Sequence, residues 1–504
     1  MSDPTDDGLA GFGYKQELER TLGNFHTFAA GISYISILTG TFQLFYFGFG
    51  FGGPAYWWSW PMVFVGQLMV ALSFAELAAH YPVAGSIYNW SKRLGSPHVA
   101  WLAGWMMLTA SIVSIAAVAL AYQTTLPQIS SFFSFSGDSA VNAVVLGTVL
   151  ILFTTLVNAW GVELMARINS AGVFIELIAA VLLIVALAVN ITRGPEVVMR
   201  TNGTGADQPW GYFGAFLIAS LASTYVMYGF DTASSLGEES HDPRKNAPKA
   251  ILRALIASFV IGGLILLLAL MAVGDIDDPR IATGGLQFIV LDVLGSTIGT
   301  IFLLAVVIAI TVCNLAVQSA AIRMMFAMGR DNNLPAGKHL ARVSPKTKTP
   351  VIPAIVSGVI AVLILVVNVG QPQIFTVITS IGIIMIYLAY LLVTVPMLVD
   401  RLRGQWPPPR KGKGTRYFSL GKLGLPVNIL GVLWGGAIVV NLAWPRRAVY
   451  NATEPYHWYL EWGAVLFVGA VAVAGFAYYW FVLRHKSGVL ADHAAEALPE
   501  EAAQ

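Results

Sequence analysis

The sequence predicts a polytopic α-helical membrane protein with twelve membrane-spanning helices. Of its 504 residues, 56% are hydrophobic and 11% are charged, against roughly 25% charged residues in a typical soluble domain. Mean hydropathy is +0.69, and apolar runs of about 18 residues or more, long enough to cross a bilayer, recur along the chain. Such long unbroken runs exclude a barrel of short alternating strands.

A membrane helix is expected wherever one of these apolar runs lies. In chain order the runs cover residues 23–49, 58–79, 98–123, 141–160, 168–192, 209–235, 249–273, 297–329, 353–369, 373–399, 427–444 and 458–484. The polar stretches 1–22 and 485–504 contain too few apolar residues to bury much surface. They are therefore expected to be disordered tails.

Basic residues are distributed unevenly between the two sides of this topology. With a cytoplasmic N-terminus, 24 of the 29 Lys and Arg residues lie on the inner side and five on the outer side. This bias follows the positive-inside rule, so we expect a multi-pass protein of the cell membrane with both termini in the cytoplasm. The inner clusters, residues 410–413 and 342–348, are expected to contact anionic lipid and not nucleic acid. The five outer residues are Arg193, Arg200, Arg280, Arg446 and Arg447.

The first and sixth helices differ from simple membrane anchors. Both are rich in Gly, Ser and Thr, and they stand five helices apart. This spacing suggests two repeats, residues 23–192 and 209–399, with residues 427–484 appended. Interrupted helices at matching positions of two halves point to a transporter site, because unpaired backbone groups must line a cavity or hold a ligand. Alternatively, the glycines serve only close helix packing.

Three segments carry a family resemblance, and they occur in the expected order along about residues 20–400. The stretch "GFDTASSLGEESHDPRKNAP" begins at Gly229, "SFAELAAHYPVAGSIYNWSKRLG" begins at Ser73, and "RMMFAMGRDNNLP" begins at Arg323. Together they resemble permeases of the amino acid–polyamine–organocation superfamily, most closely the amino acid/choline transporter branch. The resemblance implies a five-plus-five inverted repeat and a secondary transporter of an amino acid or related amine.

The same resemblance implies a substrate site midway across the membrane, between helices 1, 3, 6, 8 and 10. The helix-1 break falls on Leu38-Thr39-Gly40, where Leu38 and Thr39 replace the usual Gly and Ser. Backbone amides there are expected to face a substrate carboxylate. The candidate binding residues are Ser36, Leu38, Thr39, Gly40 and Thr41 at the first break, Tyr225, Tyr228 and Gly229 at the second, and Asn314 and Gln318 on helix 8.

Two carboxylates are the candidate coupling residues. Glu176 lies within an apolar helix and Asp231 follows the second break. An intramembrane carboxylate costs about 2.5 kcal/mol or more, so function is the default hypothesis. Glu176 could carry a proton, balance a cationic substrate, or be a structural hydrogen-bonded carboxyl. Sodium is less expected, because Ala320, Ala321 and Ile322 stand where sodium-coupled relatives place hydroxyls.

Four charged residues near the inner face are the candidate gate. Glu238 and Glu239 lie in the loop after the sixth helix, and Arg323 and Arg330 lie near the end of the eighth. We expect a charge network that holds the inner side closed. An ordinary solvated loop is the alternative.

Other classes of function are less well supported by the sequence. It contains neither a phosphate-binding loop nor a metalloprotease motif, so no enzyme activity is expected. Cys313 is the only cysteine, which leaves no disulfide framework or cysteine metal site, and neither a cofactor nor a metal is expected. A substrate-binding sensor or a channel of the same fold remains the alternative function.

Overall fold

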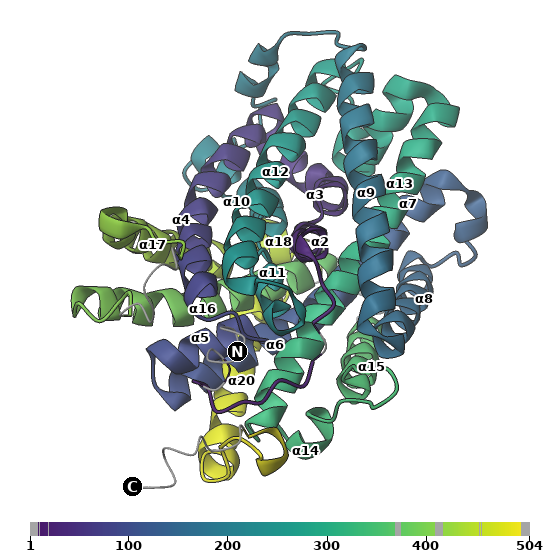
Figure 1. Ribbon diagram of the computed structural model, residues 1–504. Helices are drawn as coiled ribbons and strands as arrows, with labels where there is room; N and C mark the ends of the chain where they lie inside the picture. Colours follow the sequence, from purple (N-terminus) through teal and green to yellow (C-terminus); the bar gives the residue numbers. More distant parts are fainter. Residues whose placement is uncertain are drawn as a thin grey trace, which may run out of the picture.

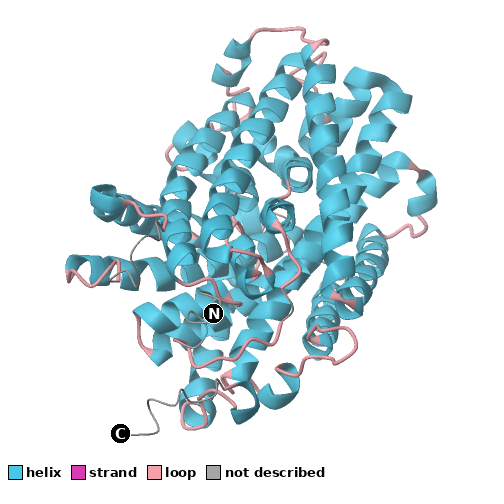
Figure 2. Cartoon of the chain, viewed as in Figure 1, coloured by secondary structure: helices cyan, strands magenta, loops and turns pink. Residues whose placement is uncertain are grey.

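The computed structural model describes residues 9, 11–18, 20–367, 374–408, 417–452, 454 and 456–494. Over these residues the chain is helical, and its only extended pairings are two isolated bridges, Tyr14 with Ala494 and Leu22 with Ser240 (Figure 2). The basic cluster predicted at residues 410–413 lies outside the described ranges. An all-helical architecture is thereby confirmed.

Ten described helical segments are long and apolar enough to cross a membrane, and two shorter apolar helices accompany them. The first six segments are α2–α3 (Asn24–Ile35 and Ile37–Gly52), η1–α4 (Pro54–Trp58 and Ser59–His80), α6–α7 (Pro97–Ala119 and Ala121–Ile129), α8 (Ser139–Trp160), α9 (Val162–Ala188) and α12 (Pro243–Ala272). The other four are α13 (Ile281–Arg330), α16 (Ile374–Leu402), α17 (Gly424–Ala443) and α20 (Gly463–Tyr478). The shorter pair is α10 (Tyr212–Val226) and α15 (Val351–Val367).

The first membrane segment is broken at Ser36, two residues before the position expected from the sequence. Ser36 has φ 37° and ψ 96°, which ends α2 and starts α3. Its hydroxyl accepts a hydrogen bond from the Thr39 amide at 3.4 Å, so Ser36 caps α3. Leu38, Thr39 and Gly40 therefore form the first turn of a helix and are not themselves unwound.

The second break lies between α10 and α11 (Thr232–Ser235), within the expected stretch. Backbone from Met227 to Asp231 is irregular, and Gly229 has φ +84°. A Cβ at Gly229 would lie 1.9 Å from the Tyr34 ring, so this turn needs glycine for both conformation and space. Tyr225, expected to be unwound, remains in the last turn of α10.

The broken helices occupy the centre of the bundle. In Figure 1, α2, α3, α10 and α11 lie together, with α17 projecting at the edge. We compare the share of residues buried in the most hydrophobic stretch of each segment. This share is 94% in the first segment, 28% in the segment that contains α17, and 17% in the last segment, residues 463–483. The centre therefore belongs to the broken helices, while the last two segments present apolar surface outward, as lipid contact requires.

The described parts of both terminal segments pack against the protein, contrary to the expectation of disordered tails. Leu9, Tyr14, Leu18 and Leu22 are each at most 4% exposed. A bridge joins Tyr14 to Ala494, which brings the two ends together. Four apolar side chains spaced along a polar stretch supply enough buried surface to order it.

Candidate functional site

Glu176 of α9 reaches the N-terminal end of α3. One of its oxygens, Oε1, accepts hydrogen bonds from the Leu38 amide at 3.1 Å and from the Ser36 hydroxyl at 3.0 Å. The side chain is 2% exposed, and its other oxygen has no partner among the described residues. A helix N-terminus favours an anion, and here the protein's own carboxylate occupies that position.

The amides expected to face a ligand carboxylate already have partners. The Leu38 amide donates to Glu176, the Thr39 amide to the Ser36 hydroxyl, and the Gly40 amide to the Ser36 carbonyl at 3.0 Å. A Cβ at Gly40 would lie 2.6 Å from a Val226 methyl, so Gly40 serves the close packing of α3 on α10. Thr41 directs its hydroxyl to the Ile37 carbonyl of its own helix.

Aromatic side chains surround the second break. The rings of Tyr34 and Tyr228 lie 6.1 Å apart, and those of Tyr225 and Tyr228 lie 6.0 Å apart. Tyr390 of α16 donates its hydroxyl proton to Asp231 and accepts from the Gly229 amide at 2.9 Å. Asp231 is 1% exposed. The two breaks thus meet through tyrosines, with a buried carboxylate beside each break.

Sequence reasoning missed Tyr34 and Tyr390. Tyr34 lies two residues before the break, and locating the break at Ser36 would have identified it. Tyr390 lies 159 residues from Asp231 along the chain, in an apolar helix with no local signal.

The two candidate residues of helix 8 face other helices. Asn314 donates to the Ile115 carbonyl of α6 at 2.8 Å, and Gln318 donates to the Thr155 hydroxyl of α8 at 2.7 Å. Ser319, the hydroxyl nearest the sodium position, donates to Asn158 of α8 at 2.6 Å. These contacts direct Asn314 toward α6, the third membrane helix, and direct Gln318 and Ser319 toward α8.

The four charged gate candidates form two buried ion pairs. Arg323 meets Glu239 through two hydrogen bonds of 3.0 and 3.1 Å, and Arg330 meets Glu238 through two of 2.8 and 3.1 Å. All four side chains are at most 4% exposed. Bidentate pairing compensates the desolvation of buried charges, so these pairs join the end of α13 to the segment after α11.

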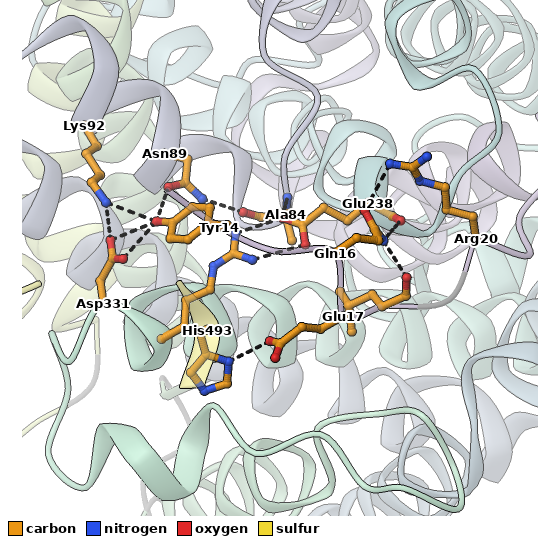
Figure 3. Close-up of polar contacts among 12 residues, drawn as sticks. Tyr14, Gln16, Glu17, Arg20, Ala84, Asn89, Lys92, Glu238, Asp331 and His493 are labelled. Carbon is orange, nitrogen blue, oxygen red and sulfur yellow. Dashed lines mark hydrogen bonds and ion pairs between the residues drawn. The ribbon is translucent and has the colours of Figure 1, made fainter. Parts of the chain in front are cut away.

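A network centred on Tyr14 lies beside these ion pairs (Figure 3). The Tyr14 hydroxyl donates to Asp331 at 2.9 Å and accepts from Lys92 at 3.1 Å, and Lys92 pairs with Asp331 at 2.6 Å. The Arg330 guanidinium lies 3.6 Å from the centre of the Tyr14 ring. Burial raises the pKa of Tyr14 well above its ordinary value, which keeps its hydroxyl a proton donor.

The C-terminal segment completes this network. The Leu490 amide donates to the Arg330 carbonyl at 2.9 Å and the Gly488 amide to the Asp331 carbonyl at 3.0 Å. His493 lies 2.6 Å from the carboxylate of Glu17 (Figure 3). We call residues 14–17 and 488–494 together the terminal clasp. It holds the described parts of both terminal segments against the last turn of α13.

The known proteins that this chain resembles include amino acid permeases from a plant, a bacterium and a fungus. The chain is 28% identical over 502 residues to amino-acid permease BAT1 of Arabidopsis thaliana, covering 95% of this chain and 94% of that protein. It is 28% identical over 363 residues to the branched-chain amino acid permease BcaP of Bacillus subtilis, covering 68% of this chain and 74% of that protein. Amino-acid permease 2 of Neurospora crassa is 25% identical over 461 residues, covering 88% and 82%.

A family model described as amino acid permease matches residues 22–471. This match includes the two breaks, both carboxylates and the two buried ion pairs. It confirms the resemblance seen in the sequence, and with it the expectation of a transporter and not an enzyme. The chain belongs to the amino acid permease family, whose members are multi-pass membrane transporters.

Proposed function

We propose that this protein is a secondary active transporter that moves an amino acid or a related amine by alternating access. The observation that carries the proposal is the meeting of two broken helices at Tyr34 and Tyr228, beside the buried carboxylates Glu176 and Asp231. Broken helices at matching positions of two repeats are the usual basis of a transporter site. The permeases named among the relatives support an amino acid or a similar small molecule as the substrate.

We further propose that transport is coupled to proton movement or exchanges one substrate for another. A buried carboxylate in the membrane that can gain and lose a proton is suited to proton-linked movement. Ser319, the nearest hydroxyl to the sodium position, is engaged by Asn158, which favours a proton over sodium. Transport is therefore expected to persist when sodium is replaced by choline or potassium.

A substrate-binding sensor or a channel of the same fold is the alternative function. The two buried ion pairs at the inner face favour a transporter, because alternating access needs a closed inner side while the site faces outward. Uptake of labelled amino acids into proteoliposomes tests the choice. Saturation together with counterflow supports transport, whereas ligand binding without flux supports a sensor and non-saturating flux supports a channel.

We further propose that the chain crosses the membrane twelve times and that both termini are cytoplasmic. Residues 23–192 and 209–399 form the inverted repeat in this architecture. Single cysteines introduced in a Cys313→Ser background test the topology. In intact cells a membrane-impermeant maleimide should label Ser136→Cys, in the loop before α8, and spare Lys338→Cys, after α13. Labelling of Lys338→Cys alone would reverse the orientation.

A further inference from the structure

A cavity lies away from the two breaks, where three membrane helices begin or end. It has a volume of about 690 Å³, and its walls come from α10 and the segment before it, from the segment after α17, and from α19 (Trp458–Glu461), which precedes α20. The chain runs from here through α10 and α11 to the buried ion pairs, so in the proposed topology the cavity lies on the outer side. The proposed transport site does not include it.

Aromatic side chains around this cavity indicate a membrane surface. Trp and Tyr gather at the level of lipid headgroups, because each has an apolar ring and a hydrogen-bonding group. Trp210 and Trp444 both line the cavity, and the centres of their rings lie 6.3 Å apart. The cavity therefore lies at the depth where headgroups meet acyl chains. The aromatic side chains of these segments that are between 44% and 70% exposed are Trp210, Trp444, Tyr456, Trp458, Tyr459 and Trp462.

Two adjacent arginines line the cavity, and neither has a carboxylate partner in the described chain. Arg446 donates to the carbonyl and to the side-chain oxygen of Asn441, at 2.5 and 2.7 Å. Arg447 lies over the Tyr456 ring, 3.4 Å from its centre. Burial lowers the pKa of Arg446, as expected where no acid compensates the charge. Neutral groups position both guanidinium groups, which leaves their charge for an anion such as phosphate.

Asn441 fixes the position of Arg446 relative to the membrane helices. Its side-chain amide donates to the Leu217 carbonyl of α10 at 3.0 Å, while its side-chain oxygen accepts from Arg446. One residue of α17 thus joins α10 to the arginine. A guanidinium that is already held in place loses little further freedom when it binds an anion.

Two carboxylates line the same cavity. Asp207 precedes α10 and Glu461 ends α19, and neither forms an ion pair with the two arginines among the described residues. Charges of both signs thus share one cavity and remain apart, which suits a ligand that carries both a phosphate and an ammonium group. Leu217 and Ile218, farther along α10, add apolar surface that a small ion would leave uncovered.

From this cavity we propose that the protein binds a zwitterionic phospholipid where α10 and α20 begin and α17 ends. Arg446 and Arg447 hold the phosphate of the lipid. Asp207 and Glu461 hold its ammonium group. The two tryptophans and the apolar side chains of α10 contact the start of its acyl chains.

Competition among lipids tests this site. The purified full chain is delipidated in detergent and mixed with equal amounts of dioleoyl phosphatidylethanolamine, dioleoyl phosphatidylglycerol and dioleoylglycerol, and bound lipids are counted by native mass spectrometry. Phosphatidylethanolamine is expected to exceed dioleoylglycerol, which lacks a phosphate, by about tenfold. It should also exceed phosphatidylglycerol, which lacks the ammonium group. Equal binding of the three lipids would overturn the proposal.

Water-soluble competitors separate a lipid from other sources of the same charges. Glycerophosphoethanolamine carries the headgroup without acyl chains, and leucine carries an ammonium group and an acid without a phosphate. Neither is expected to displace bound phosphatidylethanolamine when it is in large excess. Displacement by either compound would assign the cavity to a soluble zwitterion and overturn the lipid proposal.

Matched charge variants test the phosphate contact. In Arg446→Gln/Arg447→Gln, the ratio of bound phosphatidylethanolamine to bound dioleoylglycerol should fall by about tenfold. Arg200→Gln/Arg280→Gln removes the same charge at two exposed arginines outside the cavity and should leave the ratio unchanged. Because the lipids compete in one sample, partial misfolding does not alter the ratio. Equal ratios in the two double variants would contradict the proposal.

A second double variant tests the ammonium contact. In Asp207→Asn/Glu461→Gln, the preference for phosphatidylethanolamine over phosphatidylglycerol should disappear, because no carboxylate is left to hold the ammonium group. The preference over dioleoylglycerol should remain, since both arginines are intact. A full preference for phosphatidylethanolamine over phosphatidylglycerol in this variant would overturn the zwitterionic assignment.

Discussion

At the scale of single residues, the most informative contact is that of Glu176 with the first turn of α3. The carboxylate of Glu176, on α9, caps the start of α3, which Ser36 separates from α2. Only one oxygen of the carboxylate is engaged by these donors, and the other has no partner in the described chain. The side chain can therefore hold α3 and a bound cation or proton at the same time.

The pH dependence of ligand binding should follow the charge of Glu176. Protonation removes the negative charge that attracts an ammonium group, so affinity for an amine is expected to fall as the pH is lowered and to rise as it is increased. In Glu176→Gln this dependence should disappear. Titration calorimetry over a range of pH measures it. Full pH dependence persisting in the variant would move the titrating group to Asp231.

Gly229 gives a second residue-scale prediction. Alanine there must adopt a left-handed backbone and place its Cβ against the Tyr34 ring. Gly229→Ala is expected to lower the free energy of unfolding by about 1–3 kcal/mol and to abolish ligand binding. Thermal unfolding and a ligand-induced shift measure both effects. Gly436→Ala, where a Cβ meets nothing within 4 Å, is the control and should behave as wild type.

At the scale of helices and loops, the paired arginines hold the end of α13 to the segment that follows α11. In each pair, the arginine and the glutamate are more than 80 residues apart in the chain. A carboxylate oxygen of Glu238 also accepts from the Ala84 amide at 2.9 Å, which adds the segment before α5 (Ser86–Leu94) to the contact. In the proposed transport cycle, opening this side of the protein would have to separate several buried charges together.

Removing one partner of such an ion pair should lower the stability of the protein more than neutralising both partners. Arg323→Met leaves Glu239 buried without its partner and is expected to destabilise the protein by about 3–5 kcal/mol. The double variant Arg323→Met/Glu239→Gln should recover part of this loss, because no unpaired charge remains. Thermal unfolding in detergent measures both. The exposed pair Arg167–Glu163 is the comparison, with an expected effect below about 1 kcal/mol. Equal losses at both sites would show that the buried pair contributes no more than a surface one.

Some features of the fold and the candidate site can be predicted from the sequence, and others cannot. Apolar runs and the Gly-rich helices are local signals, so the helical class and the positions of the two broken segments were accessible. Arg323 and Arg330 were accessible because they lie in one of the three segments that carry the family resemblance. Contacts between distant segments leave no local signal, which is why Tyr390, the orientation of Asn314 and the packing of the terminal segments were missed.

At the scale of the whole molecule, the two described terminal segments meet at the last turn of α13. The terminal clasp brings residues 14–17 and 488–494 to the same turn of α13 that carries Arg330. If this side of the molecule opens during transport, as we propose, these terminal segments must move as well as the helices of the two proposed repeats.

Removing the C-terminal part of the clasp should make the inner side open more often. In a chain that stops after Lys486, the hydrogen bonds from Gly488 and Leu490 to the end of α13 are lost. A cysteine at Ser235, buried behind the ion pairs, should then react faster with a maleimide in the Cys313→Ser background. A chain that stops after Ala494 keeps the clasp and is the control. Identical labelling rates for the two chains would show that the clasp does not restrain opening.

The clasp also sets an order on how the protein is made. Residues 488–494 follow the last described helix that is long enough to cross a membrane, residues 463–483, so they are synthesised after it. Until then Arg330 and Asp331 lack the backbone contacts that Leu490 and Gly488 supply. These contacts therefore join a segment that is synthesised late to the end of α13, which is synthesised well before it.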